Sequence, residues 1–164
     1  MSEGQRVLDA IRRLVRQLRM SDRSAQQRAG ISAAQLFVLS QIGRAPNISL
    51  GELAERTYTD QSSVSAIVTR LVETGLVARG RAGDDARRLV LTLTRAGRAA
   101  LRKVPGVAQE QIVAAIEKMP PAERKHFADT FNKLLNAIGA EESAPMLFEE
   151  DARTEKKKRR SDGA

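Results

Sequence analysis

The stretch from Ser49 to Gly75 carries start and stop signals for two helices joined by a very short connection. Ser49 and Glu52 have the spacing of a capping box, which predicts a short helix that ends near residue 56. Asp60 suits the N-cap of a second helix over residues 60–74, and Gly75 is placed to end that helix in the left-handed conformation. A short helix, a tight turn at residues 57–59 and a longer helix together predict a helix-turn-helix.

Two strand-like runs follow this pair of helices. Residues 76–79 form the first run, and residues 80–88 form a polar segment that contains two glycines and several arginines. In the second run Leu89, Leu91 and Leu93 alternate with other residues at the period of two that is typical of a strand. A β-hairpin directly after a helix-turn-helix is a wing, so the predicted fold class is mainly α with a small β-hairpin wing.

Further helices flank this unit. An amphipathic helix is expected over residues 5–28, because apolar residues recur at helical spacing and Gly30 follows. Ser32 and Gln35 form another capping box, and Thr94 can cap a helix that begins at residue 95. The Pro105-Gly106 pair should kink or break that helix, and Pro120-Pro121 should begin the last one. Beyond residue 140 the chain is charged and is expected to be mostly disordered.

The composition excludes several classes of site. The chain has 164 residues, which suggests one domain with a tail, and it contains no Cys and one His. Disulfides, thiolate zinc sites and cysteine redox sensing are therefore excluded, and neither a metal nor a cofactor is expected. The chain has no apolar run of membrane-spanning length and no signal-peptide block, so it is expected to be cytoplasmic and without a membrane partner.

The net charge of +8 indicates an acidic partner such as nucleic acid. Residues 1–28 carry seven Arg against three acidic residues, and residues 60–103 carry eight Arg and one Lys against four. The conspicuous basic run at residues 156–160 is cancelled by acidic residues within residues 141–164. The excess is therefore expected on the first helix and on the reading helix and wing.

The helix over residues 60–74 is expected to turn one apolar face to the core and an opposite face with short hydroxyl side chains to solvent. The candidate DNA-reading residues on this helix are Ser62, Ser63, Ser65, Thr69 and Arg70. Short side chains allow close approach to base edges, and an Arg can bind guanine through two hydrogen bonds. The first turn is also expected to direct free N–H groups toward an anion. The alternative is that the serines are ordinary soluble surface.

The predicted wing supplies the second group of candidate DNA-binding residues, which comprises Arg79, Arg81, Asp85, Arg87 and Arg88. An Arg on a thin hairpin fits the minor groove, where the negative potential is enhanced at narrow A·T-rich stretches. Asp85 can pair with an Arg and fix its direction. The alternative is a surface ion pair, which is worth about 0–1 kcal/mol.

The order and spacing of these segments resemble the MarR (multiple antibiotic resistance regulator) family over residues 5–139. The resemblance is carried by three runs, which are residues 49–54 (SLGELA), residues 60–65 (DQSSVS) and residues 70–77 (RLVETGLV). Residues 85–87 (DAR) and 93–97 (LTRAG) are similar to the family's wing signature and to the start of its next helix. The Pro105-Gly106 pair departs from the family, in which this helix is usually continuous.

The resemblance implies a domain over residues 1–139, in which residues 32–94 bind DNA and residues 5–28 and 95–138 form a homodimer. It also implies a pseudo-palindromic operator, with Arg87 in the minor groove and Asp85 orienting it. Many members are released from DNA by a small ligand, often a phenolic or other aromatic acid. Arg12, Arg16, Phe37 and Ser40 lie on segments that line the family's ligand pocket, and the alternative for these four is ordinary core and surface.

A ligand-responsive, homodimeric transcriptional repressor is therefore the leading hypothesis. The alternative is a non-specific or architectural DNA-binding protein, which the basic tail favours. An enzyme is not expected, because the sequence has neither a glycine-rich phosphate loop nor a metal-spaced set of His, Asp and Glu.

Overall fold

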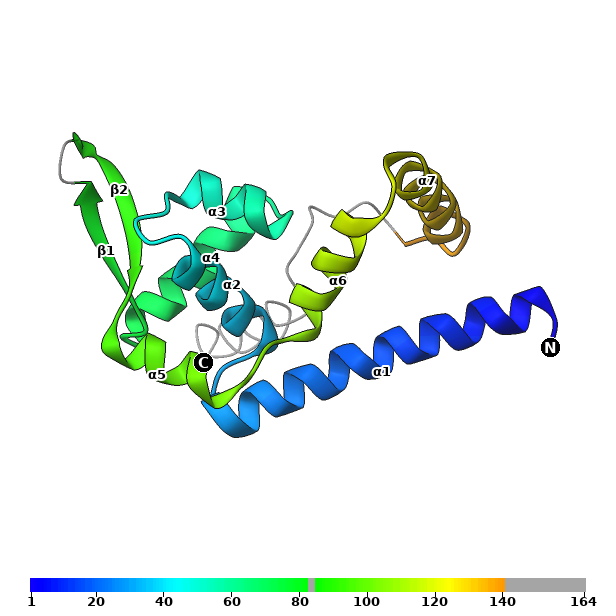
Figure 1. Ribbon diagram of the computed structural model, residues 1–164, viewed down its shortest axis with the longest axis horizontal. Helices are drawn as coiled ribbons and strands as arrows, with labels where there is room; N and C mark the ends of the chain where they lie inside the picture. Colours follow the sequence, from blue (N-terminus) through cyan, green and yellow to red (C-terminus); the bar gives the residue numbers. More distant parts are fainter. Residues whose placement is uncertain (83–84, 141–164) are drawn as a thin grey trace, which may run out of the picture.

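The computed structural model describes residues 1–82 and 85–140, and for residues 82–88 it describes no side chain. The described part is mainly helical, with one antiparallel hairpin (Figure 1). In chain order the helices are α1 (Glu3–Ala29), α2 (Ala33–Arg44), α3 (Leu50–Thr57), α4 (Gln61–Glu73), α5 (Arg95–Lys103), α6 (Ala108–Lys118) and α7 (Pro121–Ala137). The hairpin strands β1 (Val77–Ala82) and β2 (Asp85–Leu93) stand between α4 and α5. The predicted fold class is confirmed.

The helix starts follow the local signals in the sequence. Capping boxes form at Ser32 and Ser49, and the side chains of Asp60 and Thr94 cap α4 and α5. These side chains accept hydrogen bonds from backbone N–H groups that a helix start leaves without a partner. The left-handed Gly75 follows α4 as predicted.

The core lies around α2, which packs against α1, α3, α4, α5 and α6. Among its largest fully buried side chains are Phe37, Leu39, Leu53 and Leu71. In α4 the predicted core face is confirmed, because Val64, Ile67, Val68 and Leu71 are all buried. The helix-turn-helix is thus held by its own apolar face against α2.

The hairpin pairs Val77 with Leu93 at its base and Arg81 with Leu89 toward its tip. The predicted alternation of buried and exposed residues in β2 is wrong in detail, because Leu89 is exposed while Val90 and Leu91 are both buried. Leu91 is covered because its N–H donates to the carbonyl oxygen of Ile48 over 2.8 Å, which joins the hairpin base to the segment before α3. Leu89 lies beyond this contact and has no such cover.

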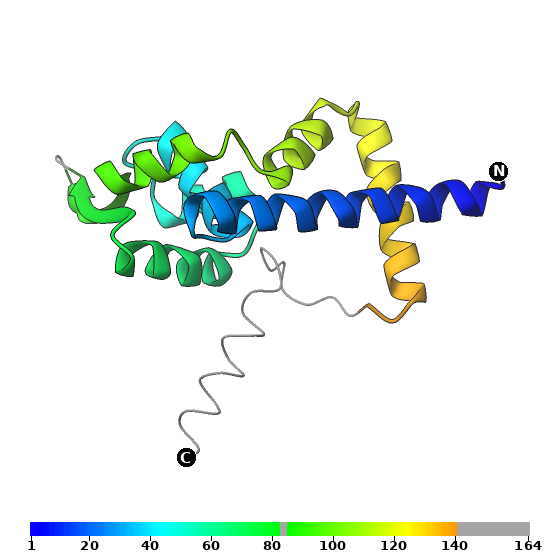
Figure 2. The ribbon, with the colours of Figure 1, turned by 90° about the horizontal axis from the view of Figure 1, so that it is seen from below.

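The predicted interruption at Pro105-Gly106 is confirmed, since α5 ends at Lys103 and α6 begins at Ala108. The N-terminal half of α1 extends away from the lobe, and α7 lies beyond α6 on the same side (Figures 1 and 2). Helix α7 buries none of its residues, and α1 buries only Ala25. Within residues 1–82 and 85–140, no helix has both the length and the apolar character needed to span a membrane. The expectation for the tail beyond residue 140 lies outside the described residues.

Candidate nucleic-acid interface

Helix α4 presents a polar face on the side away from the core. Ser62 and Thr69 are exposed, while Ser63, Ser65 and Arg70 are partly exposed on its flanks. These five side chains are the candidate DNA-reading residues of this helix, and all five lie off the buried stripe. Helix α4 therefore has the form of a reading helix, with one side in the core and short polar groups on the other.

Asp60 is the N-cap of α4. The backbone N–H of Ser63 donates to Asp60 Oδ1 over 2.9 Å, and the Ser63 hydroxyl donates to Oδ2 over 2.5 Å. The Ser62 hydroxyl also donates to Oδ1. The expectation of free N–H groups in this turn is thus wrong for Ser63, because the carboxylate of the chain itself takes the place of an external anion.

The same contacts change the acidity of Asp60. Hydrogen bonds from Ser62 and Ser63 hold the pKa of the Asp60 carboxyl well below its usual value, because they stabilise the charged form. The carboxylate therefore stays ionised at any pH at which a DNA complex forms. It also keeps both hydroxyls oriented at the end of the reading helix.

Replacing Asp60 by asparagine should remove an acid-sensitive part of the stability. A lowered folded pKa stabilises the protein above the unfolded pKa, and this contribution is lost as the pH falls below about 4 toward the folded value. We expect the wild type to be more stable than Asp60→Asn at pH 6, and the difference to shrink at pH 4 and again at pH 2. Urea midpoints of both proteins at the three pH values measure this, and a difference that does not change with pH would contradict it.

Arg79 joins the hairpin to the reading helix. Its guanidinium donates to the hydroxyl of Thr69 over 3.0 Å, and that hydroxyl donates to the carbonyl oxygen of Ser65 over 2.9 Å. Arg79 and Arg81 are both exposed on β1. The contact brings a wing residue and α4 residues together on one surface, as the sequence analysis expected. The side chains of Asp85, Arg87 and Arg88 lie outside the described residues.

The positive charge is distributed differently from the expectation. Of the nine basic residues in the segment 60–103, four lie on α5, namely Arg95, Arg98, Arg102 and Lys103. Helix α5 packs against α2 and β2 at the base of the hairpin, and it does not belong to the surface of α4 and the wing tip (Figure 1). The prediction that all the positive charge of residues 60–103 lies on the reading helix and wing was therefore wrong, because a count along the chain does not show that the chain changes direction after β2.

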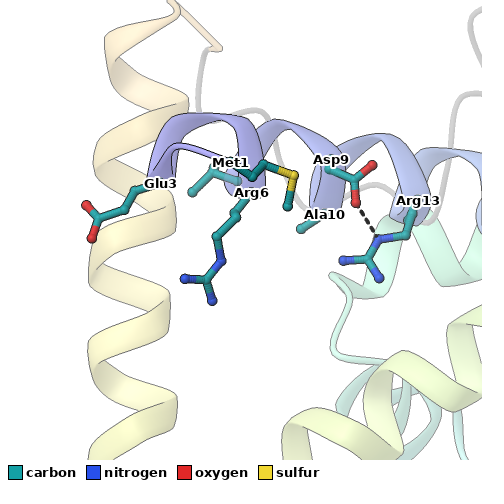
Figure 3. A pocket seen from close by; sticks show the side chains of 7 residues that line it. Met1, Glu3, Arg6, Asp9, Ala10 and Arg13 are labelled. Atoms are coloured by element: carbon teal, nitrogen blue, oxygen red, sulfur yellow. Dashed lines mark ion pairs between the residues drawn. The ribbon is translucent and has the colours of Figure 1, made fainter.

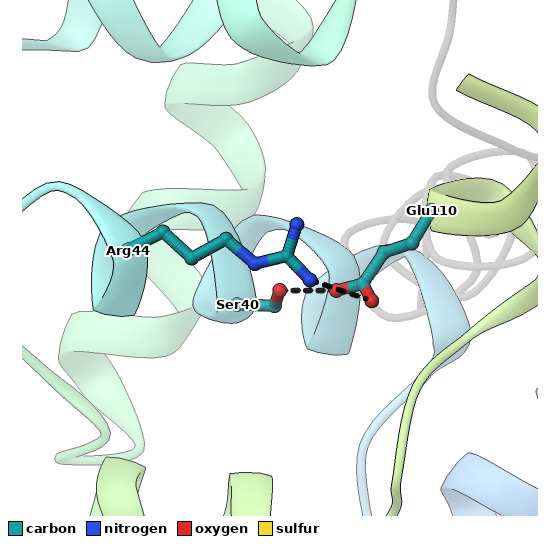
Figure 4. Close-up of polar contacts among 3 residues, drawn as sticks. All are labelled: Ser40, Arg44 and Glu110. Carbon is teal, nitrogen blue, oxygen red and sulfur yellow. Dashed lines mark hydrogen bonds and ion pairs between the residues drawn. The ribbon is translucent and has the colours of Figure 1, made fainter. Parts of the chain in front are cut away.

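A cleft of about 380 Å³ opens between α2, α3 and α6, with Phe37 among its lining residues. On its rim the Ser40 hydroxyl and the Arg44 guanidinium both donate to Glu110 of α6, the latter over 3.2 Å (Figure 4). The Ser40 side chain is therefore occupied by α6. Arg12 and Arg16 are exposed on α1 and are not among the residues that line this cleft, so the four candidate ligand residues are not brought together.

A second polar bridge spans the same cleft. The Tyr58 hydroxyl donates to Glu117 Oε1 on α6 over 3.1 Å, and this hydrogen bond raises the pKa of the Tyr58 phenol. Tyr58 ends α3 in the left-handed conformation, within the turn of the helix-turn-helix. Tyr58, Glu110 and Glu117 could not be predicted from local spacing in the sequence, because their partners are 59 to 70 residues away.

A shallow hollow near the N-terminus is lined only by residues 1–13 (Figure 3). The Arg13 guanidinium forms an ion pair with Asp9 over 3.1 Å along its edge. Both side chains are largely exposed, so this pair contributes little to stability. Because no second element contributes to the hollow, it gives no enclosed binding site.

Comparison with known proteins shows which family this chain resembles. Residues 29–88 match the sequence model of the MarR family. The HTH-type transcriptional regulator BilQ of Clostridium symbiosum is 29% identical over 112 residues, which cover 68% of this chain and 78% of BilQ. Residues 29–88 are therefore similar to the MarR family.

Two further proteins are similar to this chain. The HTH-type transcriptional repressor MdtR of Bacillus subtilis is 33% identical over 73 residues, which cover 44% of this chain and 47% of MdtR. The crystal structure of Streptococcus pneumoniae FabT in complex with DNA has a TM-score of 0.57 at 18% identity, covering 84% of this chain and 98% of FabT. The likeness to FabT establishes a shared winged helix fold. BilQ and MdtR are transcriptional regulators by name.

Proposed function

We propose that this protein is a homodimeric repressor that binds a pseudo-palindromic operator and is released by a small ligand. The observation that carries the proposal is the shared surface of α4 and β1, in which Arg79 donates to Thr69. This contact sets the hairpin beside a helix with short hydroxyl side chains. Such a helix can enter the major groove while an arginine on the hairpin reaches the minor groove.

The proposed DNA-binding residues form two groups. Helix α4 supplies Ser62, Ser63, Ser65, Thr69 and Arg70, and the hairpin supplies Arg79, Arg81, Asp85, Arg87 and Arg88. Ser62 and Ser63 act as the phosphate- or base-facing end of α4, with their hydroxyls oriented by Asp60. Arg87 is proposed to enter the minor groove, with Asp85 orienting it.

The homodimer is proposed to form through residues 5–28 and 95–138. Support comes from apolar side chains that the chain itself leaves uncovered, such as Val7 and Leu8 on α1 and Phe127 and Leu134 on α7. Large apolar side chains that a chain leaves exposed on several helices are typical of a protein–protein contact. A two-fold dimer would place two α4 helices about one turn of DNA, ~10 bp, apart.

The cleft between α2, α3 and α6 is the proposed effector site. Its floor includes Phe37 and Val113, and its rim carries the bridges from Ser40 and Tyr58 to α6. A ligand that enters this cleft competes with bridges that tie the helix-turn-helix to a proposed dimerisation segment. Aromatic acids are the ligand class suggested by the family, and Arg44 and Arg56 at the cleft are the cations that would receive a carboxylate.

Replacing Arg87 by alanine should weaken operator binding about tenfold and lower the salt slope of binding by about 1, because one contact with the DNA is lost. The dimer should persist, since Arg87 lies on the hairpin. Gel shifts with the protein's own promoter region at several salt concentrations, together with sedimentation, measure both effects. Arg28→Ala, which removes an exposed arginine at the end of α1, is the matched control and should bind like the wild type.

The alternative of a non-specific architectural protein is tested by removing residues 141–164. The repressor should keep its preference for the operator over random DNA after this truncation. An architectural protein that depends on the basic tail should lose most of its affinity for any DNA. Equal affinity of the full chain for its own promoter region and for random DNA would overturn sequence-specific repression.

A further inference from the structure

Four arginines form a straight row along α1. Arg12, Arg16, Arg19 and Arg23 are separated by four, three and four residues, so they lie on one side of the helix. All four are exposed. At 1.5 Å per residue the row is about 16 Å long, with a guanidinium at nearly every turn.

The row points away from the lobe. The opposite side of α1 is fixed by Ala25, which is fully buried, and by two hydrogen bonds. The Ser21 hydroxyl accepts from the N–H of Ala108 over 2.9 Å, and Asp22 Oδ1 accepts from the N–H of Ala33 over 3.0 Å. At 100° per residue, the row lies about 140° from the direction of these contacts.

The row has no intramolecular partner in the part of the chain that the structure describes. None of its four guanidiniums forms an ion pair there, whereas the off-row Arg13 is paired with Asp9. Asp22, which is near the end of the row in sequence, is bound to the start of α2. Four like charges on one side of a helix repel one another weakly, so a bound anion would stabilise the row.

Helix α5 carries a second row. Arg95, Arg98 and Arg102 lie on the same side of α5 on successive turns, because they are three and four residues apart. All three are exposed, and only Arg98 has a partner among the described residues, donating to the carbonyl oxygen of Leu93 over 2.9 Å. No acidic residue occurs in α5.

Both rows are remote from the proposed operator-binding surface. Helix α2 packs against both α4 and α5, α5 lies at the base of the hairpin, and α1 runs along the side of the molecule away from the hairpin tip (Figure 1). Strand β2 alone, with nine residues, holds the start of α5 roughly 25 Å from the tip. A duplex held by α4 and the hairpin tip therefore does not contact either row.

We propose that the arginine rows of α1 and α5 bind the phosphate backbone of a second DNA duplex, so that the protein bridges two DNA segments. The inference rests on the proposed function only for the identity of the first duplex. The partner must be a linear polyanion of high charge density, and a DNA duplex carries one charge per about 1.7 Å of its axis. All seven residues of the two rows are arginines, and an arginine binds phosphate through paired hydrogen bonds.

The test uses the full-length protein held on beads that carry the operator duplex, to which a fluorescent duplex of random sequence is added. The row variant is Arg16→Ala/Arg19→Ala/Arg23→Ala. The matched control is Arg6→Ala/Arg13→Ala/Arg28→Ala, which removes the same charge from a third side of the same helix. A lysine variant, Arg16→Lys/Arg19→Lys/Arg23→Lys, keeps the positive charge. It tests whether a loss of capture comes from the lost charge or from misfolding.

We expect the row variant to capture at least about tenfold less of the second duplex, with a salt slope lower by about 3, while the control and the lysine variant keep most of the capture. The row variant and the matched control should retain the operator duplex equally well, because both sets of changes lie on α1 and away from α4 and the hairpin. Arg95→Ala/Arg102→Ala should also reduce capture of the second duplex. These results together would support the bridging role.

Equal capture by the row variant and the wild type would overturn the proposal, as would a wild type that captures no second duplex. Row-dependent binding to vesicles of phosphatidylglycerol and phosphatidylcholine, without row-dependent capture of DNA, would also overturn it in favour of a membrane surface. A wild type that holds random and operator beads equally well would contradict operator specificity. The row-dependent difference would remain measurable on either kind of bead, so the two failures are distinguishable.

Discussion

An alanine at position 97 should destabilise the fold by about 3 kcal/mol, although alanine is the better helix former. Gly97 lies in the first turn of α5 and is buried. A Cβ atom there would stand 2.1 Å from the backbone oxygen of Leu76, which is far inside contact distance. The clash is with backbone and not with a flexible side chain, so the helix or the strand must move.

Three elements meet at this point, which is why the movement is costly. The Thr94 backbone N–H and hydroxyl both donate to Leu76 O, over 3.1 and 3.2 Å, and the hydroxyl also donates to Gly75 O over 2.6 Å. The N–H of Gly97 donates back to the Thr94 hydroxyl over 3.0 Å. Displacing α5 therefore strains its own cap and the end of the reading helix together.

The matched control is Gly51→Ala in the first turn of α3, where an added Cβ meets nothing within 4 Å. There the gain in helix propensity should act alone and stabilise the protein by up to about 1 kcal/mol. Urea unfolding of both variants and the wild type gives the comparison. Equal free energies of unfolding for Gly97→Ala and the wild type would contradict this prediction, because they would show that α5 can move away from Leu76 without loss of stability.

The features that the sequence predicted correctly are those decided by neighbours in the chain. Ser32, Ser49, Asp60 and Thr94 cap their helices because an N-cap needs only a side chain and a backbone N–H three residues later. The break at Pro105-Gly106 is equally local, because proline removes a donor and clashes with the preceding turn. The apolar stripe of α4 was predictable from its period alone.

The features that the sequence could not predict depend on contacts between distant segments. Ser40 was a candidate ligand-binding residue because of its place in the sequence, yet its hydroxyl donates a hydrogen bond to Glu110. The bridge from Tyr58 to Glu117 likewise requires knowing that α6 returns to the turn of the helix-turn-helix. The basic residues of α5 were assigned to the reading surface because a count along the chain does not reveal that α5 packs on a different side of α2 from α4.

Truncation of Phe37 to alanine should cost the lobe about 3–5 kcal/mol, the range for a buried aromatic residue. Phe37 is 1% exposed in the centre of α2, the helix that packs against most of the other helices. Its loss leaves a cavity between helices that cannot collapse independently, because α2 is held by several neighbours at once. A domain of this size has a stability of only about 5–15 kcal/mol, so the variant should unfold at a much lower urea concentration.

Phe127→Ala provides the same chemical change at an uncovered site. Phe127 is 50% exposed on α7 and stacks on Phe131 at a ring distance of 5.7 Å. Under the proposed homodimer it should weaken subunit association, seen as a concentration-dependent shift in sedimentation. The stability of the lobe should change much less, and monomeric behaviour of both the wild type and Phe127→Ala would contradict the dimer. If Phe127→Ala instead destabilised a monomer as strongly as Phe37→Ala, α7 would belong to the core of its own chain.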